Sequence, residues 1–459
     1  MLQHKLQDLF EEPACAKNRA KDDKARKKGC GGKPLTPGNA AGGCAFDGAK
    51  IVLQPITDAA HLVHGPIACE GNSWDSRHAL SSGPMLYRTG FTTDLGELDV
   101  IYGGEKRLFK AIKELVAKYD PPAVFVYQTC VTAMIGDDIE TVCRVASERF
   151  GKPIIPVNAP GFVGKKNLGT KLAGEVLLNH VIGTEEPEVT TPTDINLIGE
   201  YNVSGDLWTV TPLFKRLGIR LLTSITGDAR YHDVTKAHRA RVNMMVCSQA
   251  LINVARKMEE RWGIPYFEGS FYGVKDTGTS LRTIARMLVE RGAEPSLIDR
   301  TKALIAEEEA RVASELAGIL PDLKGKKVLL YTGGVKSWSM ISALHYAGMV
   351  VIGSSTRKAT KEDKARAAEL MGEEGETIDN LPQRDMYAKL KNREADIMLS
   401  GGRTQFVALK AKTPWLDSNQ ERHSAYAGYD GTITLLKEIH KELTNPVWDL
   451  VRKPAPWEV

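Results

Sequence analysis

Short apolar runs alternate with amphipathic stretches from about residue 120 onward. Residues 123–127 (AVFVY) follow two prolines and are apolar throughout, which is typical of a strand buried on both faces of a parallel sheet. Acidic residues at Asp137 and Asp138 then predict an amphipathic helix that continues to Phe150 and ends at Gly151. The next apolar run, 154–157, predicts a second strand.

The same cycle recurs toward the C-terminus, with a long helical connection expected at 296–320. Strands are expected at 195–198, 219–223, 242–246, 328–331, 349–353 and 396–399. Helices are expected at 206–217, 248–262, 361–371 and 432–443, with a further helix after the strand 328–331 that ends at 347. Alternation of strands and helices with glycine at the joints indicates an α/β fold with several doubly wound parallel sheets.

Residues that directly follow strands are the first candidates for chemistry, because ligands of such sheets collect beyond the carboxyl ends of the strands. Cys130 lies three residues after the run 123–127, and Cys247 follows the run 242–246 directly. Two glycine-containing turns, at 333–336 and 401–402, follow two other predicted strands.

Composition narrows the class of protein. The chain has 459 residues, of which 42% are hydrophobic and 26% charged, as in ordinary globular proteins. A net charge of +4 is small for this length and gives no support to nucleic acid or an anionic membrane as a partner. The first residues lack the features of a secretory signal, and no apolar run approaches the ~18–20 residues that span a bilayer. We therefore expect a cytoplasmic protein.

Seven scattered cysteines argue against a disulfide framework and leave buried thiols or metal ligands. Glycines lie close to Cys44 (GGCAF) and Cys69 (HGPIACEG), and glycine lets backbone approach a bulky ligand closely. Thiolates such as these and Cys130 are the ligands of iron–sulfur clusters. Taken singly, each of the three is more typical of a small buried hydrophobic residue than of a metal ligand, and no CxxC spacing overturns that interpretation.

Three thiolates would leave a four-iron cubane one ligand short. The fourth ligand would have to be Cys15, Cys30, a group other than cysteine, or a residue of a second chain. Cys15 and Cys30 fall in a Lys-, Arg- and Gly-rich stretch at 11–43 that we expect to be an extended arm. Cys143 falls in the middle of a predicted helix and is expected to pack in the core.

Six segments, taken in order, resemble the nitrogenase molybdenum–iron protein family, and most closely its branch that assembles the iron–molybdenum cofactor. The segments are 43–77, 121–140, 198–208, 247–273, 331–340 and 419–431. The resemblance extends from about residue 40 to 445 and includes the long motifs around the cysteines.

The resemblance implies three Rossmann-like domains with central parallel sheets. The expected division is a basic N-terminal arm at 1–43, a cluster-binding domain at 44–190, a second domain carrying Cys247 at 191–320, and a third domain with the C-terminal helix at 321–459. It also implies that Cys44, Cys69 and Cys130 bind a [4Fe–4S] cluster at a subunit interface, with the fourth thiolate from the partner. Cys247 corresponds to the cysteine that anchors one end of the large cofactor.

Two positions distinguish a scaffold from the catalytic member of the family. By the resemblance, Lys166 and Thr170 replace a Gln and a His that line the catalytic cavity, so a proton donor with a pKa near neutrality is missing. Ser418 or Asn419 replaces the imidazole that binds molybdenum, and an amide or hydroxyl is the poorer ligand. His423 aligns several residues late and is not expected to be a ligand.

Positive charge is expected to support an anionic cluster and homocitrate. Arg77 matches a family arginine in the cavity, and Lys166 and Lys336 are further candidates, although each could equally be a solvated surface residue. The turn at 333–337 lacks the first glycine of a Walker motif, which disfavours nucleotide binding there.

The expected function is therefore that of an assembly scaffold without catalytic residues of its own. The resemblance implies an iron–sulfur–carbide precursor that matures by insertion of molybdenum and homocitrate. It also implies an N-type paralogous subunit in an α2β2-like heterotetramer, the nitrogenase iron protein, and proteins that deliver the precursor and carry the cofactor away. The alternatives are a catalytic nitrogenase α-type subunit, a protochlorophyllide reductase-like oxidoreductase, and an α/β small-molecule-binding protein with incidental cysteines.

Overall fold

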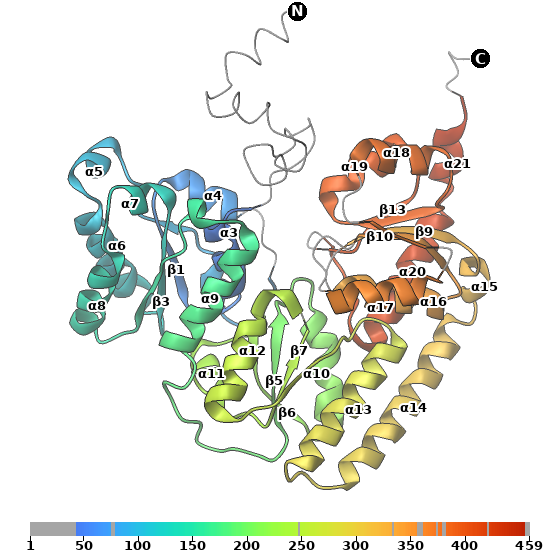
Figure 1. Cartoon of the computed structure of the whole chain (residues 1–459), viewed down its shortest axis with the longest axis horizontal. Helices are drawn as coiled ribbons and strands as arrows, with labels where there is room; N and C mark the ends of the chain where they lie inside the picture. The colour runs from blue at the N-terminus through green and yellow to red at the C-terminus, as the bar shows by residue number, and fades with distance from the viewer. Residues whose placement is uncertain are drawn as a thin grey trace, which may run out of the picture. The chain divides into compact units, whose positions relative to one another are not determined.

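The computed structural model describes residues 43–74, 79–246, 248–332, 335–355, 361–372, 375–378, 382–419 and 422–454. Three parallel β-sheets follow one another along this part of the chain, and helices flank each of them (Figure 1). The fold is α/β with Rossmann-like sheets, as the alternation of strands and helices predicts. None of the described helices is both long and apolar enough to cross a membrane.

The first sheet has the strand order β2-β1-β3-β4. Its strands are β1 (Ala60–His64), β2 (Phe91–Thr92), β3 (Val124–Gln128) and β4 (Ile154–Val157). Its helices are α3 (Ala45–Leu53), α4 (Ile67–Trp74), α5 (Glu97–Tyr102), α6 (Glu105–Tyr119), α7 (Cys130–Met134), α8 (Ile139–Phe150) and α9 (Lys166–His180). Helix α8 ends at Phe150 as predicted, where Gly151 stops it at a φ of 64°, but it begins at Ile139, just after the predicted opening at 136–138. Asp138 is instead its N-cap, because the Asp138 carboxylate accepts a hydrogen bond from the Thr141 N–H.

The second sheet has the order β6-β5-β7-β8. Its strands are β5 (Asp194–Glu200), β6 (Arg220–Thr226), β7 (Val242–Met245) and β8 (Tyr266–Glu268), and its helices are α10 (Asp206–Leu217), α11 (Tyr231–Thr235), α12 (Ser248–Trp262) and α13 (Val274–Glu290). Helices α10 and α12 have the bounds expected from the sequence. The predicted connection at 296–320 is α14 (Ser296–Leu316), followed by the short α15 (Leu320–Leu323).

The third sheet has the order β11-β10-β9-β12-β13. Its strands are β9 (Lys327–Tyr331), β10 (Val350–Ser355), β11 (Glu376–Ile378), β12 (Ile397–Ser400) and β13 (Trp415–Asp417). Its helices are α16 (Val335–Tyr346), α17 (Lys361–Met371), α18 (Gln383–Lys391), α19 (Gln405–Lys410), α20 (Gly428–Leu443) and α21 (Val447–Arg452).

Helix α20 begins four residues before the predicted start at 432, and α21 follows it, so the expectation that α20 is the last helix was wrong. Gly428 and Gly431 obscured the start, because glycine is a poor helix former. Gly431 faces the Tyr426 backbone so closely that a Cβ atom there would clash. Close packing therefore explains a glycine that a helix would otherwise disfavour.

Apolar cores join neighbouring sheets. One cluster of buried side chains includes Phe46 and Tyr127 beside the first sheet and Ile198, Ile225 and Met245 of the second. A second cluster joins residues of the second and third sheets. Burial of apolar surface, at roughly 25 cal/mol per Å², therefore holds successive sheets together.

Helices α3 and α9 pack with almost no side chain between them. A Cβ atom at Gly48 would clash with the Lys166 carbonyl, and one at Gly169 would clash with the Ala45 carbonyl. Both obstacles are backbone atoms, which cannot move aside as a flexible side chain can. This contact fixes the start of α3, where Cys44 lies, against the start of α9.

We expect Gly169→Ala to lower the free energy of unfolding by at least about 1–3 kcal/mol, because the added methyl group forces the two helices apart. Thermal and urea unfolding of the purified chain measure the effect. Gly318→Ala is the control, since a Cβ atom there meets no atom within 4 Å. Equal stability of the two variants would contradict the close contact.

Candidate functional site

Cys69 and Cys130 lie just beyond the carboxyl ends of two neighbouring strands. β1 and β3 pair in parallel, with His64 opposite Gln128. Cys69 lies in α4, which follows β1, and Cys130 opens α7, which follows β3. Parallel pairing thus brings together two thiols that are 61 residues apart in the sequence.

The backbone of His64 joins the two turns that carry these thiols. Its carbonyl accepts hydrogen bonds from the Thr129 N–H (3.3 Å) and the Thr129 hydroxyl (2.9 Å). The Thr132 hydroxyl donates to the same carbonyl at 3.2 Å. Gly65 faces the Thr129 side chain so closely that a Cβ atom would clash. The segment before Cys69 and the segment around Cys130 are therefore held as one unit.

The His64 side chain extends this hydrogen-bond network to Asp137 and Thr93. One ring nitrogen lies 2.9 Å from an Asp137 carboxylate oxygen and the other lies 3.1 Å from the Thr93 hydroxyl. Burial lowers the pKa of His64, and hydrogen bonding to Asp137 opposes that shift. Asp137 also accepts from the Gly104 N–H at 3.0 Å, so the network reaches the start of α6.

Cys44 reaches the same region from a different part of the chain. It is the N-cap residue of α3 and pairs with Lys165 in an isolated antiparallel bridge. The Ala45 N–H donates to the Gly164 carbonyl at 2.9 Å, and the Lys166 N–H donates to the Gly43 carbonyl at 2.8 Å. These backbone bonds set Cys44 beside the segment that leads into α9.

Gly161 lies between two of the sulfurs. A Cβ atom there would be 2.9 Å from the Cys130 Sγ and 3.1 Å from the Cys44 Sγ, so the two sulfurs are at most 6.0 Å apart, the sum of these distances. All three thiols are half-buried. Burial raises the pKa of the Cys69 thiol, and the neighbouring Cys130 and Cys44 raise it further. The Cys44 and Cys130 sulfurs therefore lie close together beside Gly161, and the Cys69 thiol lies near both of them.

Within the described ranges, no group of three His, Cys, Asp or Glu side chains is arranged to hold one metal ion. In a four-iron cluster each thiolate binds its own iron, so the sulfurs need not converge on one atom. Cys143 is separate from them: it is fully buried in α8, where burial raises its pKa to about 12. The expectation that it packs in the core is confirmed.

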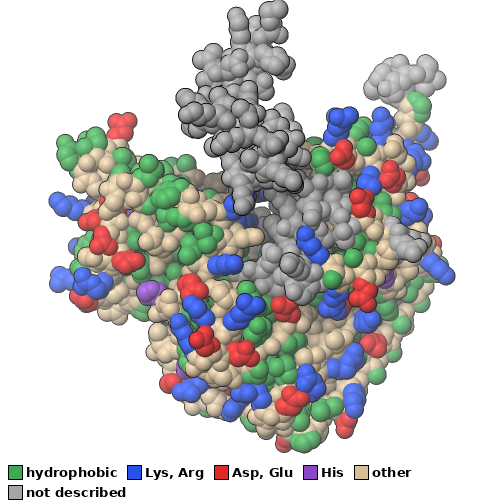
Figure 2. All heavy atoms as spheres, viewed as in Figure 1, with side chains coloured by type: hydrophobic (Ala, Val, Ile, Leu, Met, Phe, Trp, Pro, Cys, Tyr) green, Lys and Arg blue, Asp and Glu red, His purple; other side chains and the backbone are tan. Residues whose placement is uncertain are grey.

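Four exposed apolar side chains belong to the segments that carry the thiols and Gly161. Ile67, Met134, Phe162 and Val163 lie close in sequence to Cys69, Cys130 and Gly161, and they are 61%, 79%, 59% and 43% exposed. We call these four residues the apolar rim. Figure 2 shows a broad apolar area on this face, over the region of α4, α7 and α9. Large exposed apolar patches on soluble proteins mark interaction surfaces.

The other predicted site residues are placed only in part. Cys247, Arg77, and the arm cysteines Cys15 and Cys30 lie outside the described residues, and so does the side chain of Lys336 in α16. Lys166 is half-buried at the first position of α9. Thr170, one turn later, is buried, and its hydroxyl donates to the Asn167 carbonyl at 2.8 Å.

Ser418 and Asn419 follow β13 at the carboxyl edge of the third sheet. Ser418 is fully buried, and within the described part of the chain its hydroxyl has no hydrogen-bond partner. Asn419 is half-buried beside Gly401, where a Cβ atom would lie 3.1 Å from the Asn419 amide nitrogen. His423 is exposed.

A buried ion pair that sequence reasoning missed ties this segment to the second sheet. Arg422 pairs with Asp206, the first residue of α10, and both are almost fully buried. Tyr272 donates a hydrogen bond to Asp206 at 2.5 Å, and Asp206 accepts from the Tyr426 N–H at 2.9 Å. The loop after β13 is therefore fixed to the sheet from which Cys247 follows. No local pattern marks a partner 216 residues away.

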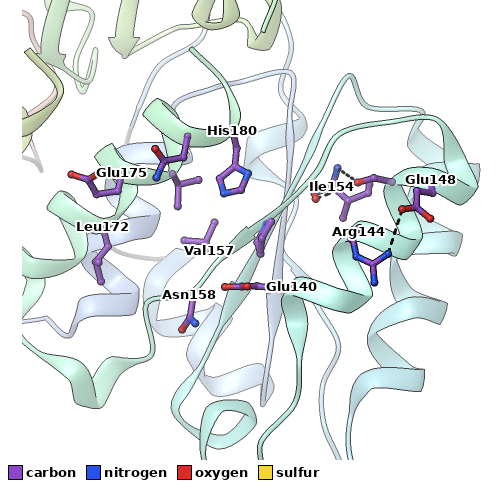
Figure 3. A pocket seen from close by; sticks show the side chains of 13 residues that line it. Glu140, Arg144, Glu148, Ile154, Val157, Asn158, Leu172, Glu175 and His180 are labelled. Carbon is purple, nitrogen blue, oxygen red and sulfur yellow. Dashed lines mark hydrogen bonds and ion pairs between the residues drawn. The ribbon is translucent and has the colours of Figure 1, made fainter. Parts of the chain in front are cut away.

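A groove of about 570 Å³ lies elsewhere, between α8, the edge strand β4 and α9 (Figure 3). Its lining includes Glu140, Glu148 and Glu175, and Glu148 pairs with Arg144 at 3.4 Å. The exposed edge of β4 offers few free N–H groups for pairing with another strand. The Ser147 hydroxyl accepts a hydrogen bond from the Ile154 N–H, and Pro156 has no N–H. We assign no role to this groove.

Comparisons with known proteins agree with the geometry. The family model described as "Nitrogenase component 1 type Oxidoreductase" matches residues 44–444. The chain is 62% identical over 453 residues, 99% of this chain and 83% of the relative, to the nitrogenase iron-molybdenum cofactor biosynthesis protein NifE of Bradyrhizobium diazoefficiens. It is 55% identical to the NifE protein of Rhodobacter capsulatus (100% and 96% covered) and 49% identical to that of Klebsiella pneumoniae (98% and 98%).

A solved structure titled "Nitrogenase Cp1 at pH 5" is similar across the fold. The TM-score is 0.83 and the sequence identity 27%, with 93% of this chain and 92% of that chain covered. The described fold is thus nitrogenase component 1-like, with helices around central parallel sheets.

We expect Cys130→Ser to lower the pKa of the Cys69 thiol, because it removes one neighbouring thiolate that disfavours ionisation. The pKa should stay above its ordinary value, since burial is the larger cause. The pH dependence of alkylation of the metal-free chain, followed by peptide mass spectrometry, measures the shift. Cys143 serves as the internal control and should stay unreacted at pH 8, whereas an unchanged Cys69 profile would show that the thiols do not interact.

Proposed function

Because the chain belongs to the nitrogenase component 1 type oxidoreductase family, we propose that it is a scaffold subunit for assembly of the iron–molybdenum cofactor of nitrogenase. The observation that carries the proposal is that the Cys44 and Cys130 sulfurs meet at Gly161 and that Cys69 lies close enough to both for their charge to raise its pKa beyond the effect of burial. Relatives that match nearly the whole chain are named for biosynthesis of this cofactor. Fold similarity alone would not distinguish assembly from catalysis.

The three thiols fit a [4Fe–4S] cluster. Gly161 leaves the space between two sulfurs open. Burial raises the pKa of Cys69, the neighbouring Cys130 and Cys44 raise it further, and bound iron would offset the repulsion among the three thiolates. The cluster, when bound, would supply one-electron transfer. A cubane needs a fourth ligand, and the apolar rim supports a partner chain as its source. We assign the partner to a paralogous N-type subunit in an α2β2-like heterotetramer.

The cargo of the scaffold is an iron–sulfur–carbide precursor, held at a second place. Cys247 anchors one end of it, and Arg77, Lys166 and Lys336 offset its negative charge. Asn419 and Ser418 lie at the other end. The buried Ser418 hydroxyl has no hydrogen-bond partner among the described residues. This supports the arrangement, since a buried hydroxyl left without a partner costs about 1–3 kcal/mol unless a bound molecule satisfies it.

Weak anchoring at one end suits a cargo that must leave. A hydroxyl or an amide binds a transition metal less well than an imidazole does. Molybdenum and homocitrate would be inserted with the help of the nitrogenase iron protein. Proteins that deliver the precursor and carry the finished cofactor complete the proposed set of partners.

The second candidate function, a catalytic α-type subunit, is disfavoured by one residue in particular. Thr170 stands where the resemblance places a catalytic histidine, and its hydroxyl is already bonded to the Asn167 carbonyl. A threonine hydroxyl has no pKa near neutrality with which to deliver protons.

Anaerobic purification of the full-length chain with its partner tests the proposal. Iron analysis and electron paramagnetic resonance should detect a cubane and a larger iron–sulfur species. Absence of iron after strictly anaerobic preparation would exclude both cluster functions and favour a small-molecule-binding protein.

We expect Cys247→Ala to lose the larger precursor and keep the cubane, because the two clusters use separate thiolates. Iron content and electron paramagnetic resonance of the purified complex measure each species. Cys143→Ala is the matched control and should keep both, since Cys143 is a buried core residue. Loss of both clusters from the Cys247 variant would show that Cys247 acts through folding instead.

We also expect the purified complex to reduce acetylene far more slowly than a nitrogenase does, because the proton donor at position 170 is missing. Gas chromatography of ethylene, with the nitrogenase iron protein and ATP supplied, measures the rate. Turnover comparable to that of a nitrogenase would overturn the scaffold assignment.

A further inference from the structure

Helices α3 and α4 are joined by a buried ion pair that the proposed function does not use. Lys50 of α3 and Glu70 of α4 form the pair, and the two residues are 1% and 5% exposed. The Lys50 ammonium also donates to the Ser73 hydroxyl at 3.0 Å, and that hydroxyl donates to the Glu70 carbonyl at 3.0 Å. These three residues contact one another, and we call them the Lys50–Glu70 clamp.

The clamp lies next to two of the thiols along the chain. Cys44 is the N-cap of α3, six residues before Lys50, and Cys69 directly precedes Glu70. Burial raises the pKa of the Tyr127 phenol, and Glu70 lies close enough for its charge to raise that pKa further. Tyr127 belongs to β3, which leads into Cys130. The clamp therefore sits among the elements that carry all three sulfurs.

Burying the two charged side chains of the clamp costs desolvation free energy. A buried pair gains little stability over well-packed apolar residues, whereas loss of one partner leaves a charge uncompensated. Net stabilisation is thus a poor reason for the clamp, and geometric specificity is a better one.

We propose that the Lys50–Glu70 clamp is a positioning device that sets the separation of the Cys44 and Cys69 sulfurs for the cluster. The assignment rests on the proposed function, because it concerns the same thiols. Neither residue binds metal in this account; each acts through the helix that carries it. Groups that orient metal ligands in this way affect metal affinity by about 10–100-fold when they are removed.

Glu70→Gln tests the clamp, and Glu308→Gln provides a matched control. Glu308 is also 5% exposed and also paired with arginines, but it lies in α14, away from the thiols. In the full-length complex, we expect Glu70→Gln to speed cluster loss to an iron chelator by about 10–100-fold. Glu308→Gln should lose the cluster at the wild-type rate, and a wild-type rate in both variants overturns the proposal.

A second variant covers the case in which Glu70→Gln does not fold. Lys50→Met combined with Glu70→Leu replaces the ion pair with apolar side chains of similar volume, a change that is often neutral for folding. We expect this double variant to be folded and to lose the cluster faster than the wild type does. Retention of the cluster at the wild-type rate overturns the proposal.

A metal-free measurement separates this proposal from the proposed function. A short bis-maleimide should cross-link Cys44 to Cys69 in the iron-free wild-type chain, and peptide mass spectrometry identifies the linked pair. Both clamp variants should form this link at a changed rate, and an unchanged rate overturns the positioning role even if the chain binds iron. A changed rate in a chain that never binds iron would support the clamp while contradicting the cluster.

Discussion

Parallel pairing of β1 with β3 is the constraint on which the candidate site depends. The pairing places His64 opposite Gln128, so both strands end at one edge of the sheet. The His64 carbonyl then accepts hydrogen bonds from Thr129 and Thr132, which joins the two turns beyond that edge. Two thiols distant in sequence become neighbours because backbone groups at the ends of buried strands must be satisfied.

Cys44 depends on a different kind of contact. Its position follows from backbone hydrogen bonds to the segment before α9 and from glycines that let helices approach. Such backbone hydrogen bonds are hard to predict from a sequence, because almost any residue can supply the N–H and C=O groups. The cysteines could therefore be chosen as candidates from the sequence, but their meeting could not be derived from spacing alone.

The parts of the fold that were predictable share strong local signals. Helix α8 has an aspartate cap and a terminal glycine, and α10 ends at Gly218 with a φ of 71°. Helix α3 has no such signal: all nine of its residues are buried, including Asp47 and Lys50, so no polar face reveals its period. Its polar residues make sense only once their tertiary surroundings are known, as the Arg422–Asp206 pair also illustrates.

The contact between α3 and α9 has a mechanical consequence. Only glycine separates the two backbones at Gly48 and Gly169, so no flexible side chain is available to absorb strain. Protein interiors resist compression, and such a pair moves as a single body. Cys44 begins one of these helices and Lys166 begins the other. A displacement of the start of α3 would therefore also displace the start of α9, and the reverse.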